Sequence, residues 1–147
     1  MINKTIITKN KNETQKLGKD LAKEIKKGVV LALYGELGSG KTTFVQGFAK
    51  GLRIKNRIIS PTFIILRKYK LKKRNFFHID LYRIQTGDDI NSLGIEEIFT
   101  NKENIIAIEW AEKLEKLLPC KRIDIFFKDL GGNKRKITIK KIDFENE

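Results

Sequence analysis

Residues 35–42 read Gly35-Glu36-Leu37-Gly38-Ser39-Gly40-Lys41-Thr42, which is the pattern G-x-x-x-x-G-K-T of a phosphate-binding loop. The six residues before it form a continuous apolar run, Val29-Val30-Leu31-Ala32-Leu33-Tyr34, typical of a buried parallel strand. After the loop, apolar residues recur at helical spacing, and Gly51 is a candidate stop for that helix: Phe44, Val45, Phe48, Ala49 and Leu52. The sequence therefore predicts a strand, a glycine-rich loop and a helix, in that order.

This arrangement assigns a chemical task to the loop. Its backbone N–H groups and the N-terminus of the following helix form a nest for phosphate oxygens, which we expect to be built from Gly38, Ser39, Gly40, Lys41, Thr42 and Thr43. Lys41 would reach the β- and γ-phosphates of a nucleotide, and the Thr42 hydroxyl would ligate Mg²⁺. Gly35 and Gly40 allow close approaches that a Cβ would forbid.

Length and composition favour one cytoplasmic domain. The 147 residues are enough for a substantial core, so we expect residues 1–147 to form a single domain. The sequence contains neither a long apolar segment nor a signal-peptide pattern, which argues against a membrane protein. The single cysteine, Cys120, excludes an internal disulfide and favours a reducing compartment.

The net charge of +13 is unevenly distributed along the chain. Residues 37–79 contain 11 Lys or Arg and no acid, whereas residues 80–115 contain nine acids and three bases. The basic half is suited to polyphosphate, RNA or an acidic protein, and it would then flank the phosphate loop on the side that meets partners. The alternative is codon bias in an AT-rich genome, because the chain has 24 Lys and 22 Ile but only 7 Arg.

The segment before the loop is predicted to form a strand over residues 2–8 and an amphipathic helix. Asn12 is the expected N-cap of this helix, with Gln15 as its capping-box partner, and Gly28 is the expected stop. The core-facing residues of the helix would be Leu17, Leu21, Ala22 and Ile25.

The segment after the loop alternates between strands and short helices. Residues 63–71 and 75–80 favour an antiparallel hairpin, residues 88–99 short helical pieces, residues 105–108 a buried strand and residues 111–118 a short helix before Pro119. Residues 122–127 and 134–142 form a second predicted hairpin around Gly131-Gly132-Asn133. We therefore predict an α/β fold of the P-loop NTPase type, with a mixed sheet, helices on both faces and antiparallel hairpins.

Three residues outside the loop are candidates for the remaining chemistry. Asp80 and Glu109 each end an apolar strand, and ligands of open α/β sheets bind beyond the carboxyl ends of parallel strands. Either acid could hold Mg²⁺ if its strand runs parallel to the strand before the loop. Thr62, in Ser60-Pro61-Thr62-Phe63, fits either a switch residue that senses the γ-phosphate or a rigid proline turn.

Together these stretches resemble the TsaE (YjeE) family, the small ATPases that bacteria need to make threonylcarbamoyladenosine in tRNA. The resemblance covers nearly the whole chain and rests on the loop with its flanks (residues 33–44), Ser60-Pro61-Thr62-Phe63, His78-Ile79-Asp80-Leu81-Tyr82-Arg83 and Ile108-Glu109-Trp110-Ala111-Glu112. Leu17-Gly18 and Arg135 also fit.

The resemblance implies a Mg²⁺-dependent ATPase that is slow alone and activated by partners. It implies ATP and Mg²⁺ as cofactors, the TsaB–TsaD pair as the protein partner, and tRNA met either indirectly or at that complex. By the same resemblance, Glu109 joins Thr42 as a metal ligand, Lys41, Asp80 and Thr62 act in catalysis, and Arg135 approaches the nucleotide.

Some residues and functions keep two interpretations. Trp110 is either a core or interface aromatic or a base-stacking platform, His78 either structural or a proton shuttle, and Arg135 either a nucleotide ligand or a surface residue. A small metabolite or nucleoside kinase would need an arginine-bearing lid, for which residues 67–74 are the available cluster. An RNA-binding module would need exposed aromatics near bases, for which Tyr69, Phe76 and Phe77 are candidates.

Overall fold

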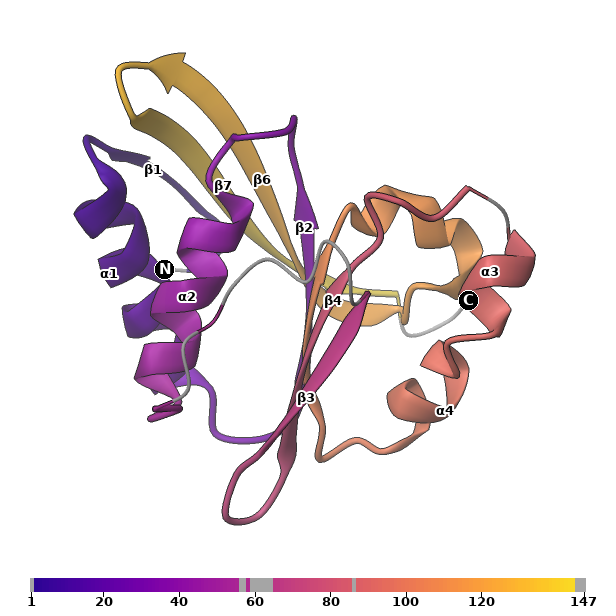
Figure 1. Ribbon diagram of the computed structural model, residues 1–147. Helices are drawn as coiled ribbons and strands as arrows, with labels where there is room; N and C mark the ends of the chain where they lie inside the picture. Colours follow the sequence, from indigo (N-terminus) through magenta and orange to yellow (C-terminus); the bar gives the residue numbers. More distant parts are fainter. Residues whose placement is uncertain (1, 56–57, 59–64, 86, 145–147) are drawn as a thin grey trace.

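A computed structural model describes residues 2–55, 58, 65–85 and 87–144. Within these residues one mixed sheet has the strand order β1-β7-β6-β2-β5-β4-β3, and helices cover both of its faces (Figure 1). In chain order the elements are β1 (Lys4–Thr8), α1 (Lys11–Glu24), β2 (Val29–Tyr34), α2 (Lys41–Gly51), β3 (Leu66–Lys70), β4 (Asn75–Asp80), α3 (Gly87–Asn91), α4 (Ile95–Thr100), β5 (Ile105–Glu109), the 3₁₀ helix η1 (Ala111–Leu117), β6 (Lys121–Gly131) and β7 (Lys134–Asp143). The predicted fold class is confirmed.

The strand that precedes the phosphate loop lies at the centre of the sheet. β2 pairs in parallel with β5 on one side and with β6 on the other, and β5 pairs in parallel with β4. The antiparallel pairs lie toward the edges, as the two predicted hairpins require: β3 with β4, β6 with β7, and β7 with β1. The carboxyl ends of β2, β4 and β5 therefore meet at one end of the sheet.

Alternation along the central strands divides the core between the two faces of the sheet. Leu31 and Leu33 of β2 pack with Phe44 and Phe48 of α2, on the face that α1 and α2 cover. Ala32, whose side chain points to the other face of β2, belongs to a second apolar cluster, which packs with α3, α4 and η1 on the opposite face of the sheet. Strands buried on both faces explain why residues 29–34 and 105–108 are apolar throughout.

Glycines bring α1 and α2 into backbone contact. A Cβ on Gly18 would lie 2.2 Å from the carbonyl oxygen of Phe44, and one on Gly47 would lie 1.9 Å from that of Gln15. Because real Cβ atoms do not approach so closely, this helix crossing requires glycine at both positions. The crossing holds α1 beside the first turns of α2, where the phosphate loop ends.

The boundaries of α1 differ from those predicted. The N-cap is Asn10, not Asn12: its extended backbone begins the helix at Lys11, and its side chain accepts a 2.9 Å hydrogen bond from the backbone N–H of Glu13. The helix ends at Glu24, before Gly28. Gly28 instead allows the α1–β2 connection to contact the α4–β5 connection, since a Cβ there would lie 1.9 Å from the carbonyl oxygen of Lys102.

The short helix after β5 also differs from the prediction, because it is a 3₁₀ helix that begins and breaks at strained residues. Trp110 caps it with φ 61°, and Glu115 interrupts it with φ 49° and ψ −117°. The predicted helical pieces in residues 88–99 are confirmed as α3 and α4. No helix within the described residues is long and apolar enough to cross a membrane.

Candidate functional site

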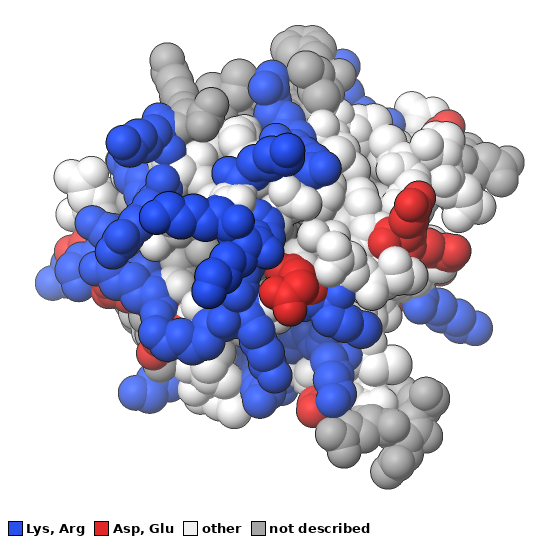
Figure 2. Space-filling model, turned by 90° about the horizontal axis from the view of Figure 1, so that it is seen from below, with Lys and Arg blue, Asp and Glu red and all other residues white. Residues whose placement is uncertain are grey.

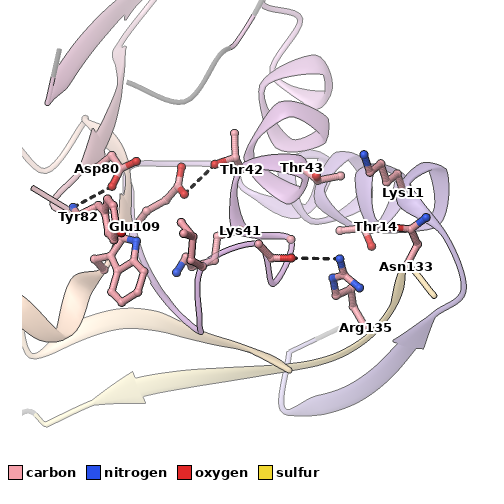
Figure 3. A pocket seen from close by; sticks show the side chains of 14 residues that line it. Lys11, Thr14, Lys41, Thr42, Thr43, Asp80, Tyr82, Glu109, Asn133 and Arg135 are labelled. Atoms are coloured by element: carbon pink, nitrogen blue, oxygen red, sulfur yellow. Dashed lines mark hydrogen bonds between the residues drawn. The ribbon is translucent and has the colours of Figure 1, made fainter. Parts of the chain in front are cut away.

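A cavity of about 560 Å³ opens where β2, β4 and β5 end and α2 begins (Figure 3). Its lining comes from the phosphate loop and α2, from the two strand-end acids with the residues that follow them, and from α1 and the β6–β7 turn. The lining residues are Lys11, Thr14, Leu37, Gly38, Gly40, Lys41, Thr42, Thr43, Asp80, Tyr82, Glu109, Trp110, Asn133 and Arg135.

The glycines of the loop are required by its geometry. Gly40 caps α2 with φ 104° and Gly38 has φ 78°, both in the left-handed region that favours glycine. Gly35, the residue after β2, has no room for a side chain: a Cβ there would lie 2.6 Å from Ser39 Oγ and 2.8 Å from the carbonyl oxygen of Phe127. The loop therefore has a glycine-dependent conformation in which backbone N–H groups can form a nest for an anion.

Lys41 is the first residue of α2 and lies almost entirely inside the site, with 4% of its surface exposed. Its ammonium donates a hydrogen bond to the carbonyl oxygen of Gly35, and Nζ lies 3.7 Å from the centre of the Trp110 ring. Burial lowers the pKa of this ammonium, and the carboxylates of Glu109, Glu112 and Asp80 oppose that shift. Lys41 is thus a desolvated cation beside the nest.

Glu109 ends β5 inside the same cavity, with 3% of its surface exposed. Thr42 Oγ1 donates to its Oε1 over 2.8 Å, and His78 Nε2 lies 2.6 Å from its Oε2. Both carboxylate oxygens are therefore engaged. Because a carboxylate oxygen accepts, Nε2 of the buried His78 carries the proton and donates to Glu109; within the described residues its Nδ1 has no hydrogen-bond partner.

Asp80 ends β4 directly beside Glu109, its register partner on the adjacent parallel strand. Its Oδ1 accepts a 2.9 Å hydrogen bond from the backbone N–H of Tyr82, which points the carboxylate toward the cavity (Figure 3). The strands of both acids run parallel to β2 and end at the phosphate loop. This is the condition under which either acid was expected to hold Mg²⁺.

The donor set fits Mg²⁺ bound together with phosphates. Within the described residues there is no cluster of three or more His, Cys, Asp or Glu side chains suited to hold a metal by itself. Mg²⁺ in nucleotide sites is usually held by one or two carboxylates, substrate phosphates and water. Thr42, Glu109 and Asp80 supply that partial set beside the loop.

The other end of the cavity is formed by α1 and the β6–β7 hairpin. Arg135 donates to the carbonyl oxygen of Gly38 over 3.1 Å and to Asp129 Oδ1 over 2.8 Å, and its Nε would lie 3.4 Å from a Cβ on Gly40. Arg135 therefore braces the loop from outside and is not an isolated surface residue.

Comparison with known proteins agrees with this geometry. The family model described as threonylcarbamoyl adenosine biosynthesis protein TsaE matches residues 8–137. This chain belongs to the TsaE family. Bacillus subtilis (strain 168) has a protein named tRNA threonylcarbamoyladenosine biosynthesis protein TsaE that is 40% identical over 131 residues, or 89% of this chain and 81% of the relative. A protein of the same name from Rickettsia prowazekii (strain Madrid E) is 40% identical over 136 residues, or 92% and 93%.

A solved structure matches the fold as well. The crystal structure of YdiB from Bacillus subtilis aligns with a TM-score of 0.76 at 34% sequence identity, over 92% of this chain and 83% of that one. The region matched by the TsaE model contains every residue that lines the cavity. The sequence match and the fold match thus both cover most of this chain.

The structure brings most of the residues expected from the TsaE motifs into one place. Lys41, Thr42, Asp80 and Glu109 share the cavity, Trp110 lies over Lys41, and Arg135 contacts the loop. Ser39 lies buried in the loop, and within the described residues its Oγ has no hydrogen-bond partner. The expected switch residue, Thr62, lies outside the described residues.

Four residues of this TsaE-family site were not expected as site residues. Tyr82 lies with its ring centre 5.2 Å from that of Trp110, and its place two residues after Asp80 was the signal that could have identified it. Lys11, Thr14 and Asn133 carry no motif. They reach the cavity only because α1 crosses α2 and the β6–β7 turn extends past the loop.

Proposed function

We propose that this chain is the Mg²⁺-dependent, ATP-hydrolysing component of threonylcarbamoyladenosine formation in tRNA. The observation that carries the proposal is the convergence of Lys41, Thr42, Glu109 and Asp80 on one cavity beside a preformed phosphate nest. The family membership supplies the biological process, since the relatives carry that process in their names.

In this proposal each residue has a separate task. Gly38, Ser39, Gly40 and Thr43 offer backbone N–H groups to phosphate oxygens, and Lys41 turns from Gly35 to the β- and γ-phosphates. Thr42 Oγ and the Glu109 carboxylate would hold Mg²⁺, which neutralises charge on the phosphate oxygens when bound. Asp80 orients the attacking water and accepts its proton, while Arg135 keeps the loop closed.

The contacts of Lys41 and Glu109 support a low rate of ATP hydrolysis in the absence of partner proteins. Lys41 is engaged by Gly35 and Trp110, and Glu109 by Thr42 and His78, so nucleotide and metal must displace contacts that the protein makes with itself. We expect a TsaB–TsaD-type complex to complete the site, with tRNA met at that complex, in the cytoplasm.

The kinase alternative is not favoured. Its expected lid, residues 67–74, belongs to the β3–β4 hairpin, which is hydrogen-bonded in register from Leu66–Ile79 to Lys70–Asn75. Because this hairpin is hydrogen-bonded into the edge of the sheet, it cannot close over a donor and an acceptor as a lid does.

A rate measurement tests the proposal. ATP hydrolysis is measured for the chain alone, with the TsaB–TsaD pair, and with the pair plus tRNA, and a set of nucleosides and small metabolites is offered as phosphate acceptors. We expect slow hydrolysis alone, a clear increase with the partners, and transfer to water only. Efficient phosphorylation of a metabolite, or no ATP turnover under any condition, would overturn it.

A further inference from the structure

Positive charge gathers at the end of the sheet opposite the phosphate loop. Figure 2 views this end, where the α1–β2 connection, the residues after α2 and the β3–β4 turn lie (Figures 1 and 2). We call the following six exposed side chains the basic end: Lys26, Lys27, Arg53, Lys55, Lys72 and Lys73.

The three segments form one continuous surface. Arg74, in the β3–β4 turn, donates to the carbonyl oxygen of Lys26 over 3.3 Å, which joins that turn to the α1–β2 connection. Arg53 and Lys55 share a groove with Lys70 of β3, which joins the end of α2 to the same hairpin. Residues that are far apart in the sequence therefore present their charges side by side.

The charge of this surface is not neutralised from within. None of the six side chains forms an ion pair with a described acid; in the β3–β4 turn the ion pair with Glu103, at 4.0 Å, is formed by Arg74. Six ammonium or guanidinium groups at one end of a small domain repel one another, so the arrangement raises the local potential for an anionic partner.

We propose that the basic end binds the phosphate backbone of RNA. Protein interfaces are depleted in lysine and centre on apolar or aromatic anchors, whereas phosphate contacts are made chiefly by Lys and Arg. The apolar residues of this end, such as Ile54, Tyr69 and Leu71, are half-buried and pack against the core, and Phe76 and Phe77 are buried in it. The surface is thus suited to backbone phosphates, and its described residues include no exposed apolar anchor for a protein partner and no exposed aromatic platform for stacked bases.

The position of this surface separates it from the nucleotide site. The basic end lies where the parallel strands begin, whereas the phosphate loop lies where they end. This corrects the expectation that the basic half of the chain flanks the loop. RNA could therefore occupy the basic end while the cavity holds nucleotide, and the acids Glu36 and Glu112 near the cavity would disfavour RNA there.

The test measures RNA binding by charge-reversed variants. Three probes are titrated: an unmodified tRNA transcript, an unrelated RNA of equal length and polyglutamate. The proteins are the wild type, the variant Lys27→Glu/Lys55→Glu/Lys72→Glu and the milder variant Lys27→Gln/Lys55→Gln/Lys72→Gln. The control variant, Lys128→Glu/Lys136→Glu/Lys140→Glu, makes the same change in net charge at exposed positions of the β6–β7 hairpin. Only the choice of tRNA as probe rests on the proposed function.

We expect both RNAs to bind the wild type, and the basic-end Glu variant to bind them about tenfold or more weakly. The slope of the logarithm of the binding constant against the logarithm of salt concentration should become less steep by about 0.7 to 0.9 for each RNA phosphate that the variant no longer neutralises. The control variant should bind within about twofold of the wild type, and Mg²⁺–ATP binding should be equal in all proteins. Equal losses in both triple variants, no RNA binding by the wild type, or binding of polyglutamate in preference to RNA would each overturn the proposal. If the wild type does not bind Mg²⁺–ATP, that result would instead count against the proposed function.

Discussion

Glu109 is the residue in which the site's contacts converge. Its two oxygens accept hydrogen bonds from Thr42 and His78, and Asp80 lies beside it on the next strand. The direct Thr42 contact favours Glu109 as the metal-side acid, because Thr42 is the loop residue whose hydroxyl is expected on Mg²⁺. In the proposed function Asp80, whose Oδ1 accepts a hydrogen bond from the backbone N–H of Tyr82, acts on the attacking water.

These positions predict separable effects for the two acids. Glu109→Ala should weaken Mg²⁺-dependent nucleotide binding about tenfold or more, since a metal ligand supports the bound ground state. Asp80→Ala should bind nucleotide nearly as the wild type does but lower the partner-stimulated rate about 100-fold, as expected for a group that acts in proton transfer. The fluorescence of Trp110, the only tryptophan and a neighbour of Lys41, reports binding with and without Mg²⁺. The reverse pattern would exchange the two roles.

His78 is predicted to position Glu109, which favours its structural interpretation over a proton shuttle. His78→Leu removes the donor to a buried carboxylate, and second-sphere changes of this kind lower metal affinity about 10- to 100-fold. His78→Gln keeps an N–H donor of similar reach and should restore most of the Mg²⁺ affinity. The measurement is a Mg²⁺ titration of nucleotide binding. If the Leu and Gln variants behave alike, the hydrogen bond to Glu109 has no such role.

At the scale of elements, the α1–α2 crossing and the loop are one unit. α2 begins at Lys41, and the crossing at Gly18 and Gly47 sets how α1 brings Lys11 and Thr14 to the cavity. Helix propensity favours alanine over glycine by about 1 kcal/mol, so the glycines of these helices are retained for contact and not for helix formation.

Gly47→Ala should therefore destabilise the fold despite the gain in propensity. The new methyl group would overlap the backbone of α1 at Gln15, and overpacking of this kind costs about 1–3 kcal/mol. Lys50→Ala, at an exposed position of the same helix, is the matched control: it removes a 3.3 Å hydrogen bond to the Gln15 side chain but no buried packing, and should change the free energy of unfolding by less than about 0.5 kcal/mol. Denaturant unfolding measures both. An unchanged or raised stability for Gly47→Ala would show that the crossing is looser than described.

At the scale of the whole molecule, the features predicted from sequence were those with a local signal. Apolar runs identified β2 and β5, and the turn residues 131–133 identified the β6–β7 hairpin. The cap of α1 was misplaced because two asparagines compete for it, and Asn10 rather than Asn12 has the extended backbone that a cap needs. That the β3–β4 turn meets the α1–β2 connection and the end of α2 could not be predicted, because charge along the chain does not show which ends of the elements meet.

The site was predictable to the same degree. Lys41, Thr42, Asp80 and Glu109 follow from a loop motif and from acids at strand ends, since parallel strands carry such acids to one edge. Lys11, Thr14 and Asn133 depend on helix crossing and hairpin length, which have no motif. That residues 1–147 are one domain stays a prediction.

The central claim is that the phosphate loop performs partner-activated ATP hydrolysis, and the Lys41→Ala variant tests it most directly. ATP turnover is measured for the wild type and the variant, alone and with the TsaB–TsaD pair and tRNA, with melting temperature as the check on folding. Lys41 donates to loop carbonyls and has no substitute cation within the loop, so we expect the variant to stay folded and to lose at least about 100-fold of the stimulated rate. A folded variant that hydrolyses ATP at the wild-type rate with its partners would contradict the account.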